Sequence, residues 1–176
     1  MTPTPLALEP GLPEALATAL DDEYRARATY ETVLATFGPA PPFRRIVDAE
    51  ERHIAALEAV FQSHGITPPP DRWRGRVAPP PSLAQACRDG VQGEIGNYRM
   101  YDRLLGRVSA PDVRAVFTSL RSASACNHLP AFEACAEGLP RFRGAVEDLR
   151  ALEDELDGVG APPTPGRFPE WEHRGG

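Results

Sequence analysis

Hydrophobic positions recur with a helical period in four segments of this chain, and clusters of proline separate the segments. Within each segment the apolar residues step by three and four, so that each helix has one apolar face to bury. The pattern predicts helices at about 12–37, 42–64, 82–105 and 109–135, with almost no strand-like alternation. The fold class expected from this pattern is all-α.

The lengths of the connections select the topology. The first and second helices are joined by a short connection, as are the third and fourth, so each pair should form an antiparallel hairpin. The second and third helices are separated by the 17 Pro-rich residues 65–81. At ~3.1 Å per residue these reach ~53 Å, enough to return along a helix of ~37 Å. Two hairpins with one long crossover predict a four-helix bundle.

The helical domain is expected to cover residues 12–157, with a flexible N-terminus at 1–11 and a flexible tail at 158–176. A short C-terminal fifth helix is expected at about 142–157, on the apolar positions Val146, Leu149 and Leu156. Pro130 falls inside the fourth helix and lacks the N–H that would bond to the carbonyl of Cys126. A kink or break is therefore predicted there.

Carboxylate and imidazole side chains interrupt the apolar faces in two sets, about seventy residues apart. The residues of the two sets are Glu23, Glu50 and His53, then Glu94 and His128. Glu50 and His53 are three residues apart, which lets both face one ion. Polar groups in a core destabilise the fold unless they are hydrogen-bonded or bound to a ligand. Divalent iron, manganese and zinc all suit mixed carboxylate and imidazole ligands.

Distances from the turns place these residues at one level of the bundle. Glu23 lies 14 residues before the end of its helix at Phe37, and Glu50 lies about 13 after it. Glu94 and His128 stand about 15 and 18 residues from the turn of their own hairpin. The sequence therefore predicts that the five side chains converge in the core.

Four segments together resemble the ferritin-like superfamily, in particular a bacterial branch related to rubrerythrin and ferritin-type di-iron proteins. The segments are EYRA at 23–26, AEERH at 49–53, E-I-x-N followed by a tyrosine at 94–101, and NHLPAF at 127–132. The resemblance covers about residues 12–137 and implies a ferritin-like four-helix bundle. It also implies a site of four Glu and two His, matched here by Glu23, Glu50, His53, Glu94 and His128. Ala125 departs from the pattern at the sixth position.

The resemblance implies two iron or two manganese ions, with oxidase, ferroxidase or peroxide-handling activity on O2 or peroxide. The alanine at 125 leaves three arrangements open: a water-filled coordination position, an asymmetric pair of ions, or a single ion. Tyr30 and Tyr101, each seven residues after the Glu of their helix, are candidates for a redox or channel role. The alternative is that both are buried tyrosines with a satisfied hydroxyl. The alternative functions are a non-catalytic metal-binding or storage protein and a metal-free helical interaction module.

Composition argues against nucleic acid and membrane as binding partners. The formal charge of −6 gives no basic surface for nucleic acid, and no apolar run approaches the roughly 18 residues of a membrane span. No secretory signal precedes the first helix, so a cytoplasmic location is expected. Cys87, Cys126 and Cys135 contain no CxxC pair and are expected to be free, mostly buried thiols. A monomer or a homodimer is expected.

Overall fold

The structure is a computed structural model that describes residues 9–138 of the chain. The helix expected at about 142–157 and the tail expected at 158–176 lie outside the described residues, as do the first eight residues of the expected N-terminal segment.

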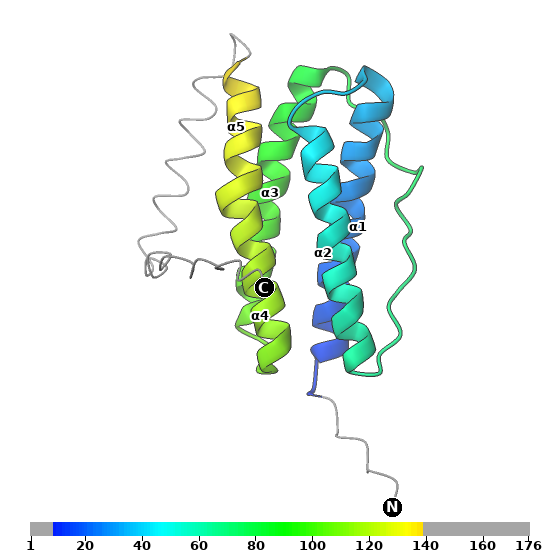
Figure 1. The fold of residues 1–176 in the computed structure, drawn as a ribbon, viewed down its shortest axis with the longest axis vertical. Helices are drawn as coiled ribbons and strands as arrows, with labels where there is room; N and C mark the ends of the chain where they lie inside the picture. The colour runs from blue at the N-terminus through cyan, green and yellow to red at the C-terminus, as the bar shows by residue number, and fades with distance from the viewer. Residues whose placement is uncertain (1–8, 139–176) are drawn as a thin grey trace, which may run out of the picture.

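The described residues form helices only. In chain order the elements are α1 (Leu12–Phe37), α2 (Phe43–Ser63), α3 (Leu83–Leu105), α4 (Pro111–Ala123), the π-helical turn η1 (Ser124–His128) and α5 (Leu129–Glu137). In Figure 1, α1 runs upwards and α2 returns beside it, whereas α3 runs downwards and α4–α5 returns. The expected all-helical bundle of two antiparallel hairpins is confirmed. No helix within residues 9–138 has an apolar stretch long enough to cross a bilayer.

Local chemistry explains where the helices begin and end. Gly38, with φ 80°, stops α1, and its N–H bonds to the carbonyl of Leu34 at 3.0 Å. At the start of α3 the backbone N–H of Gln85 donates to Ser82 Oγ at 3.1 Å. Pro111 occupies the first turn of α4, where its missing N–H removes no helical bond. The helix bounds therefore agree with the predicted ones to within a few residues.

Two apolar clusters fill the bundle, one towards each end. One is built around Leu16, Leu20, Leu57 and Phe117, and the other around Tyr30, Phe43, Val91 and Phe132. Buried polar side chains lie between the clusters along the helices; these are Glu23, Glu50, Glu94, Asn97, Ser124 and His128. We call this set, together with the partly exposed His53, the polar layer.

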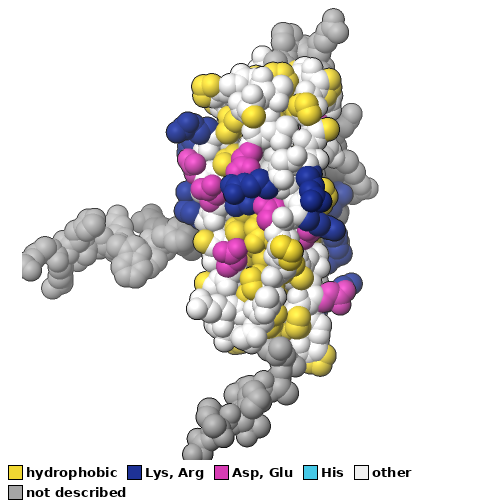
Figure 2. Space-filling model, turned by 90° about the vertical axis from the view of Figure 1, so that its right-hand side faces the viewer, with side chains coloured by type: hydrophobic (Ala, Val, Ile, Leu, Met, Phe, Trp, Pro, Cys, Tyr) yellow, Lys and Arg dark blue, Asp and Glu magenta, His cyan; other side chains and the backbone are white. Residues whose placement is uncertain are grey.

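The long connection between α2 and α3 is fastened to the outside of α1. Arg72 makes two hydrogen bonds to the carboxylate of Asp21, at 2.8 and 2.7 Å, and the indole N–H of Trp73 donates to the same carboxylate at 3.0 Å. Arg27 pairs with Asp71 of the connection at 2.6 Å. Figure 2, which views this side of the molecule, shows acidic and basic side chains intermixed across the middle of the face.

The expectation of free thiols is wrong for two of the three cysteines. Cys87 of α3 and Cys135 of α5 form a disulfide, with their Cα atoms 5.7 Å apart. Packing of α5 against α3 brings together two residues 48 positions apart, at a spacing that suits a disulfide. Cys126 is free but exposed rather than buried. A cytoplasmic location stays a prediction.

Candidate metal centre

All five residues expected to bind metal meet in the polar layer. They come from four elements: Glu23 from α1, Glu50 and His53 from α2, Glu94 from α3 and His128 from η1. The three carboxylates are at most 3% exposed, and His128 is 4% exposed. Two groups have the composition of a metal site, namely Glu23–Glu50–His53 and Glu50–Glu94–His128. In each group one ligand atom per residue lies within 4.8 Å of the others.

Glu50 belongs to both groups and turns one oxygen to each. Its Oε2 is 2.9 Å from Nδ1 of His53, and its Oε1 is 3.3 Å from Nδ1 of His128. The outer carboxylates complete the groups: Glu23 Oε2 lies 3.1 Å from His53 Nδ1, and Glu94 Oε2 lies 3.3 Å from His128 Nδ1. The two imidazole rings stack with centroids 5.3 Å apart. Each Nδ1 thus faces two carboxylates.

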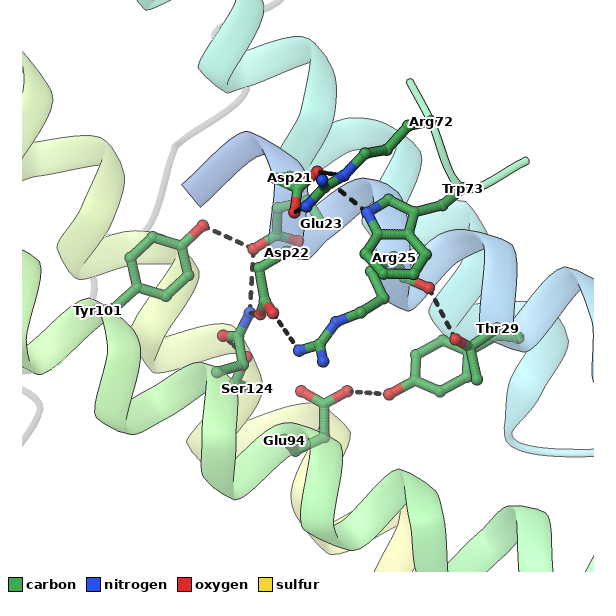
Figure 3. A network of polar contacts seen from close by, with 12 residues as sticks. Asp21, Asp22, Glu23, Arg25, Thr29, Arg72, Trp73, Glu94, Tyr101 and Ser124 are labelled. Carbon is green, nitrogen blue, oxygen red and sulfur yellow. Dashed lines mark hydrogen bonds and ion pairs between the residues drawn. The ribbon is translucent and has the colours of Figure 1, made fainter. Parts of the chain in front are cut away.

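The two predicted tyrosines contact the site across the hairpins. Tyr101 of α3 donates to Glu23 Oε1 at 2.6 Å, and Tyr30 of α1 donates to Glu94 Oε1 at 2.7 Å. Figure 3 shows Tyr101 directed at Glu23. Each tyrosine therefore holds the Glu of the opposite hairpin, and it occupies the oxygen that does not face an imidazole. Whether either has a redox or channel role stays a prediction.

A neighbouring amide network was not assigned from the sequence. The side-chain amide of Asn97 donates to Glu23 Oε1 at 3.2 Å and to Asp22 Oδ2 at 3.0 Å. Ser124 in turn donates to Asn97 Oδ1 at 2.6 Å. The available signal was helical spacing, because Asn97 lies three residues after Glu94 and so shares its face.

The π-helical turn η1 explains what stands where the sixth ligand was expected. The N–H of Leu129 bonds to the carbonyl of Ser124, five residues back, just before Pro130. This wider turn buries Ser124 and His128 together, whereas Ala125 is only half-buried. Ser124, hydrogen-bonded to the amide of Asn97, is therefore the inward residue of this turn.

Burial and charge act in opposite directions on the carboxylates. Burial, reinforced by the nearby charge of Glu50, raises the pKa of Glu23 from 4.5 to about 7. Burial also acts to raise the pKa of Glu50, but the adjacent imidazoles of His128 and His53 outweigh it and leave that pKa lowered. Glu23 therefore keeps a proton more readily than Glu50.

The imidazoles and phenols hold their protons tightly. Burial acts to lower the pKa of both histidines, but the surrounding carboxylates raise the pKa of His53 to about 9 and that of His128 to about 10. Burial, with the neighbouring carboxylates, keeps the pKa of Tyr30 and Tyr101 well above the ordinary value of 10. Without metal, both imidazoles therefore favour the protonated, positively charged form beside the carboxyl groups that surround them.

One unsatisfied atom shows how well the residues fit a metal. Nδ1 of His128 is buried and has no hydrogen-bond partner, although Glu50 and Glu94 oxygens each lie 3.3 Å away. Buried polar atoms without partners are rare in proteins. A nitrogen directed between two carboxylate oxygens is instead a suitable donor for divalent iron, manganese or zinc. The donor set therefore fits metal binding.

Comparison with known proteins identifies the fold but not a family. No protein-family model matches the chain, and no curated protein matches it. The structure is similar to the crystal structure of hypothetical protein MJ0754 from Methanococcus jannaschii DSM 2661, with a TM-score of 0.68. The two chains are 18% identical, and the match covers 78% of this chain and 86% of that one. At this identity the likeness shows a common fold alone.

Proposed function

We propose that this protein is a ferritin-like metal-binding protein whose polar layer holds two divalent ions and reacts them with O2 or peroxide. The carrying observation is the shared carboxylate of Glu50, which directs one oxygen to each of two Glu–Glu–His groups. The two hairpins and the single long connection support the ferritin-like assignment. Iron is the first expectation, with manganese and zinc as alternatives.

The residues divide naturally between two ions. Glu23 and His53 would hold one ion, Glu94 and His128 the other, and Glu50 both. Two divalent ions carry four positive charges against three carboxylates, which leaves a net charge of +1 on the centre. The site has one carboxylate fewer than the resemblance to the ferritin-like superfamily implies. We therefore expect water or an anion as an additional ligand.

The surrounding residues position the ligands. A pair of Fe²⁺ or Mn²⁺ ions supplies electrons to O2 or peroxide when bound. Tyr101 and Tyr30 hold one oxygen each of Glu23 and Glu94, which leaves the other oxygen free to face its imidazole. The apolar clusters close the layer towards the two ends of the bundle. Both phenols stay protonated and so act as hydrogen-bond donors.

A metal-free helical interaction module is the second candidate, and the raised pKa values of the two histidines favour it. The pKa of His53 is raised to about 9 and that of His128 to about 10, so without metal both imidazoles carry a positive charge that the neighbouring carboxylates stabilise. Such a layer is stable only while the histidines keep their protons. Metal binding, which requires neutral imidazoles, distinguishes the two candidates.

The test is metal analysis of the purified protein, followed by anaerobic titration with Fe²⁺ and exposure to air. We expect two equivalents of iron in the wild type and near-ultraviolet absorption of oxidised iron after air is admitted. Glu50→Ala should lose both. Glu51→Ala changes the next residue, which is exposed, and is the matched control that should keep both.

The other outcomes select other functions. Two equivalents bound without oxidation would favour a storage or non-catalytic metal-binding protein. No bound metal in the wild type would leave the helical interaction module.

A further inference from the structure

A cleft opens beside the polar layer, between α2 and the η1–α5 side of the second hairpin. Its volume is about 430 Å³, within the range of small-molecule sites. His53 and His128 both line it, so it reaches the candidate metal centre. The remaining lining includes Arg45, Ala49 and Arg52 of α2 on one wall and Cys126, Asn127 and Ala131 of η1 and α5 on the other.

Small side chains keep the cleft open. Ala49 lies midway between Arg45 and Arg52 on the α2 wall, and Ala123 and Ala131 lie on the opposite wall. Because an alanine side chain extends only one carbon from the backbone, the space between the two walls is left for a ligand.

The charge of the cleft is opposite to that of the protein. The lining contains no Asp or Glu, although the chain has a formal net charge of −6. Arg45 and Arg52 are exposed, and neither has an ion-pair partner within residues 9–138. A smaller cleft between α1 and α3, of about 160 Å³, has three acidic residues in its lining, Asp22, Asp89 and Glu94, against one basic residue, Arg25. The two sides of the polar layer therefore attract ligands of different charge.

The inner wall of the cleft adds hydrogen-bond donors. Both histidines turn Nδ1 to the carboxylates, so the opposite ring nitrogen, Nε2, is the one available to the cleft. An imidazole that ligates a metal through Nδ1 carries its proton on Nε2. The cleft thus presents several hydrogen-bond donors: two guanidinium groups, two ring N–H groups and the amide of Asn127. These donors match a ligand that only accepts hydrogen bonds.

We infer that this cleft binds a small organic anion, through a carboxylate or phosphate group, as a substrate or co-substrate of the metal centre. Its role as a substrate rests on the proposed function. Its binding does not, because the arginines and the ring N–H groups are present with or without metal. The size of the cleft indicates a small molecule, and its lack of acidic residues indicates an anion.

Isothermal titration calorimetry tests the binding, with succinate and inorganic phosphate as separate probes. We expect at least one probe to bind both the Zn²⁺-loaded and the chelator-treated protein. Arg45→Ala and Arg52→Ala should each weaken that binding at least tenfold. Arg44→Ala removes an exposed arginine from another face of the same helix and should have no such effect. Succinate and phosphate distinguish the two anion chemistries.

The thiol of Cys126 supplies an independent readout within the cleft. It is the free cysteine of the chain, because the other two form the disulfide. The measured quantity is the rate at which an anionic aromatic disulfide reagent with two carboxylates reacts with this thiol, divided by the rate for neutral dithiodipyridine. We expect this ratio to be higher in the wild type than in Arg52→Ala. The bound anion should slow the anionic reagent in the wild type, and Arg44→Ala should behave as the wild type.

Each result decides the inference separately from the proposed function. No binding of either probe at 10 mM, or equal weakening by Arg44→Ala and Arg45→Ala, would overturn it even if the protein binds iron. Selective anion binding by a protein that binds no metal would keep the cleft and remove the metal centre instead.

Discussion

At the scale of single residues, the two oxygens of each outer carboxylate have different partners. Glu23 receives hydrogen bonds from Tyr101 and Asn97 on Oε1 and faces His53 with Oε2. Glu94 repeats this division with Tyr30 and His128. The phenols therefore fix which oxygen of each carboxylate is available to a metal.

Removal of the hydroxyl groups of these two tyrosines should weaken metal binding without unfolding the protein. Tyr101→Phe and Tyr30→Phe each keep the buried ring and lose the donor, so we expect metal affinity to fall roughly 10- to 100-fold. Competition with a chromophoric chelator measures the affinity. Tyr98→Phe is the control, because that ring lies against Arg121 rather than in the polar layer. Unchanged affinity in both variants would show that the carboxylates need no such support.

The metal-free protein should lose stability as the pH rises. The fold raises the pKa of His53 and His128, so the stability they contribute is present in full below their ordinary pKa of 6.5 and is lost as the pH passes about 9 and about 10. The raised pKa of Glu23 acts in the same direction between 4.5 and about 7. Urea denaturation in chelator at pH 6, 8 and 10 measures the change, and constant stability would contradict it.

The sequence predicted which side chains meet but not how they pair. Helical spacing placed Glu23, Glu50, His53, Glu94 and His128 at one level, and the structure brings them together. It could not show that Tyr30 and Tyr101 contact the opposite hairpin, because a helical period identifies a face and not the neighbour that the face meets. The same limit hid the contact of Asn97 with Glu23.

At the scale of elements, the departure from α-helical geometry at η1 was predicted only in part. Pro130 indicated a kink at the carbonyl of Cys126, and the structure has a π-helical turn over Ser124–His128 there. A missing N–H shows where the α-helical bonds must fail, but not that the turn widens rather than bends. Ser124 and His128 both belong to the face that the helical period predicts to be buried, and the structure buries both.

Close packing between α3 and α5 depends on one glycine. A Cβ on Gly90 would lie 2.5 Å from a ring carbon of Phe132, which is fully buried. We expect Gly90→Ala to destabilise the protein by about 1–3 kcal/mol through overpacking. Gly96→Ala, on the same helix with nothing within 4 Å of its Cβ, should instead stabilise it by roughly 0.5–1 kcal/mol. Thermal denaturation compares the two, and equal shifts would contradict the prediction.

At the scale of the whole molecule, the long connection is a structured part of the bundle. Its length was predicted from the spacing of the prolines, but its attachment to α1 was not, since ion pairs between distant segments leave no local pattern. Asp21 carries much of that attachment through Arg72 and Trp73.

Loss of this attachment should expose the connection to protease. We expect Asp21→Ala to speed trypsin cleavage after Arg72, Arg74 and Arg76 several-fold, because cleavage requires the segment to leave the helix surface. Asp102→Ala breaks an exposed ion pair with Arg121, away from the connection, and is the control. Timed digestion with mass spectrometry locates the cuts. Equal cleavage of both variants would mean that Asp21 does not restrain the segment.

The polar layer also has a consequence for the alignment of the helices. The polar layer occupies one level of the bundle, so displacing one helix by a single turn, about 5.4 Å, would break its contacts. Such a displacement would carry Glu23, Glu94 or His128 into hydrocarbon, away from every partner. A buried charge without a partner is strongly destabilising. The layer thus adds an electrostatic penalty against misaligned helices to the one that close packing already imposes.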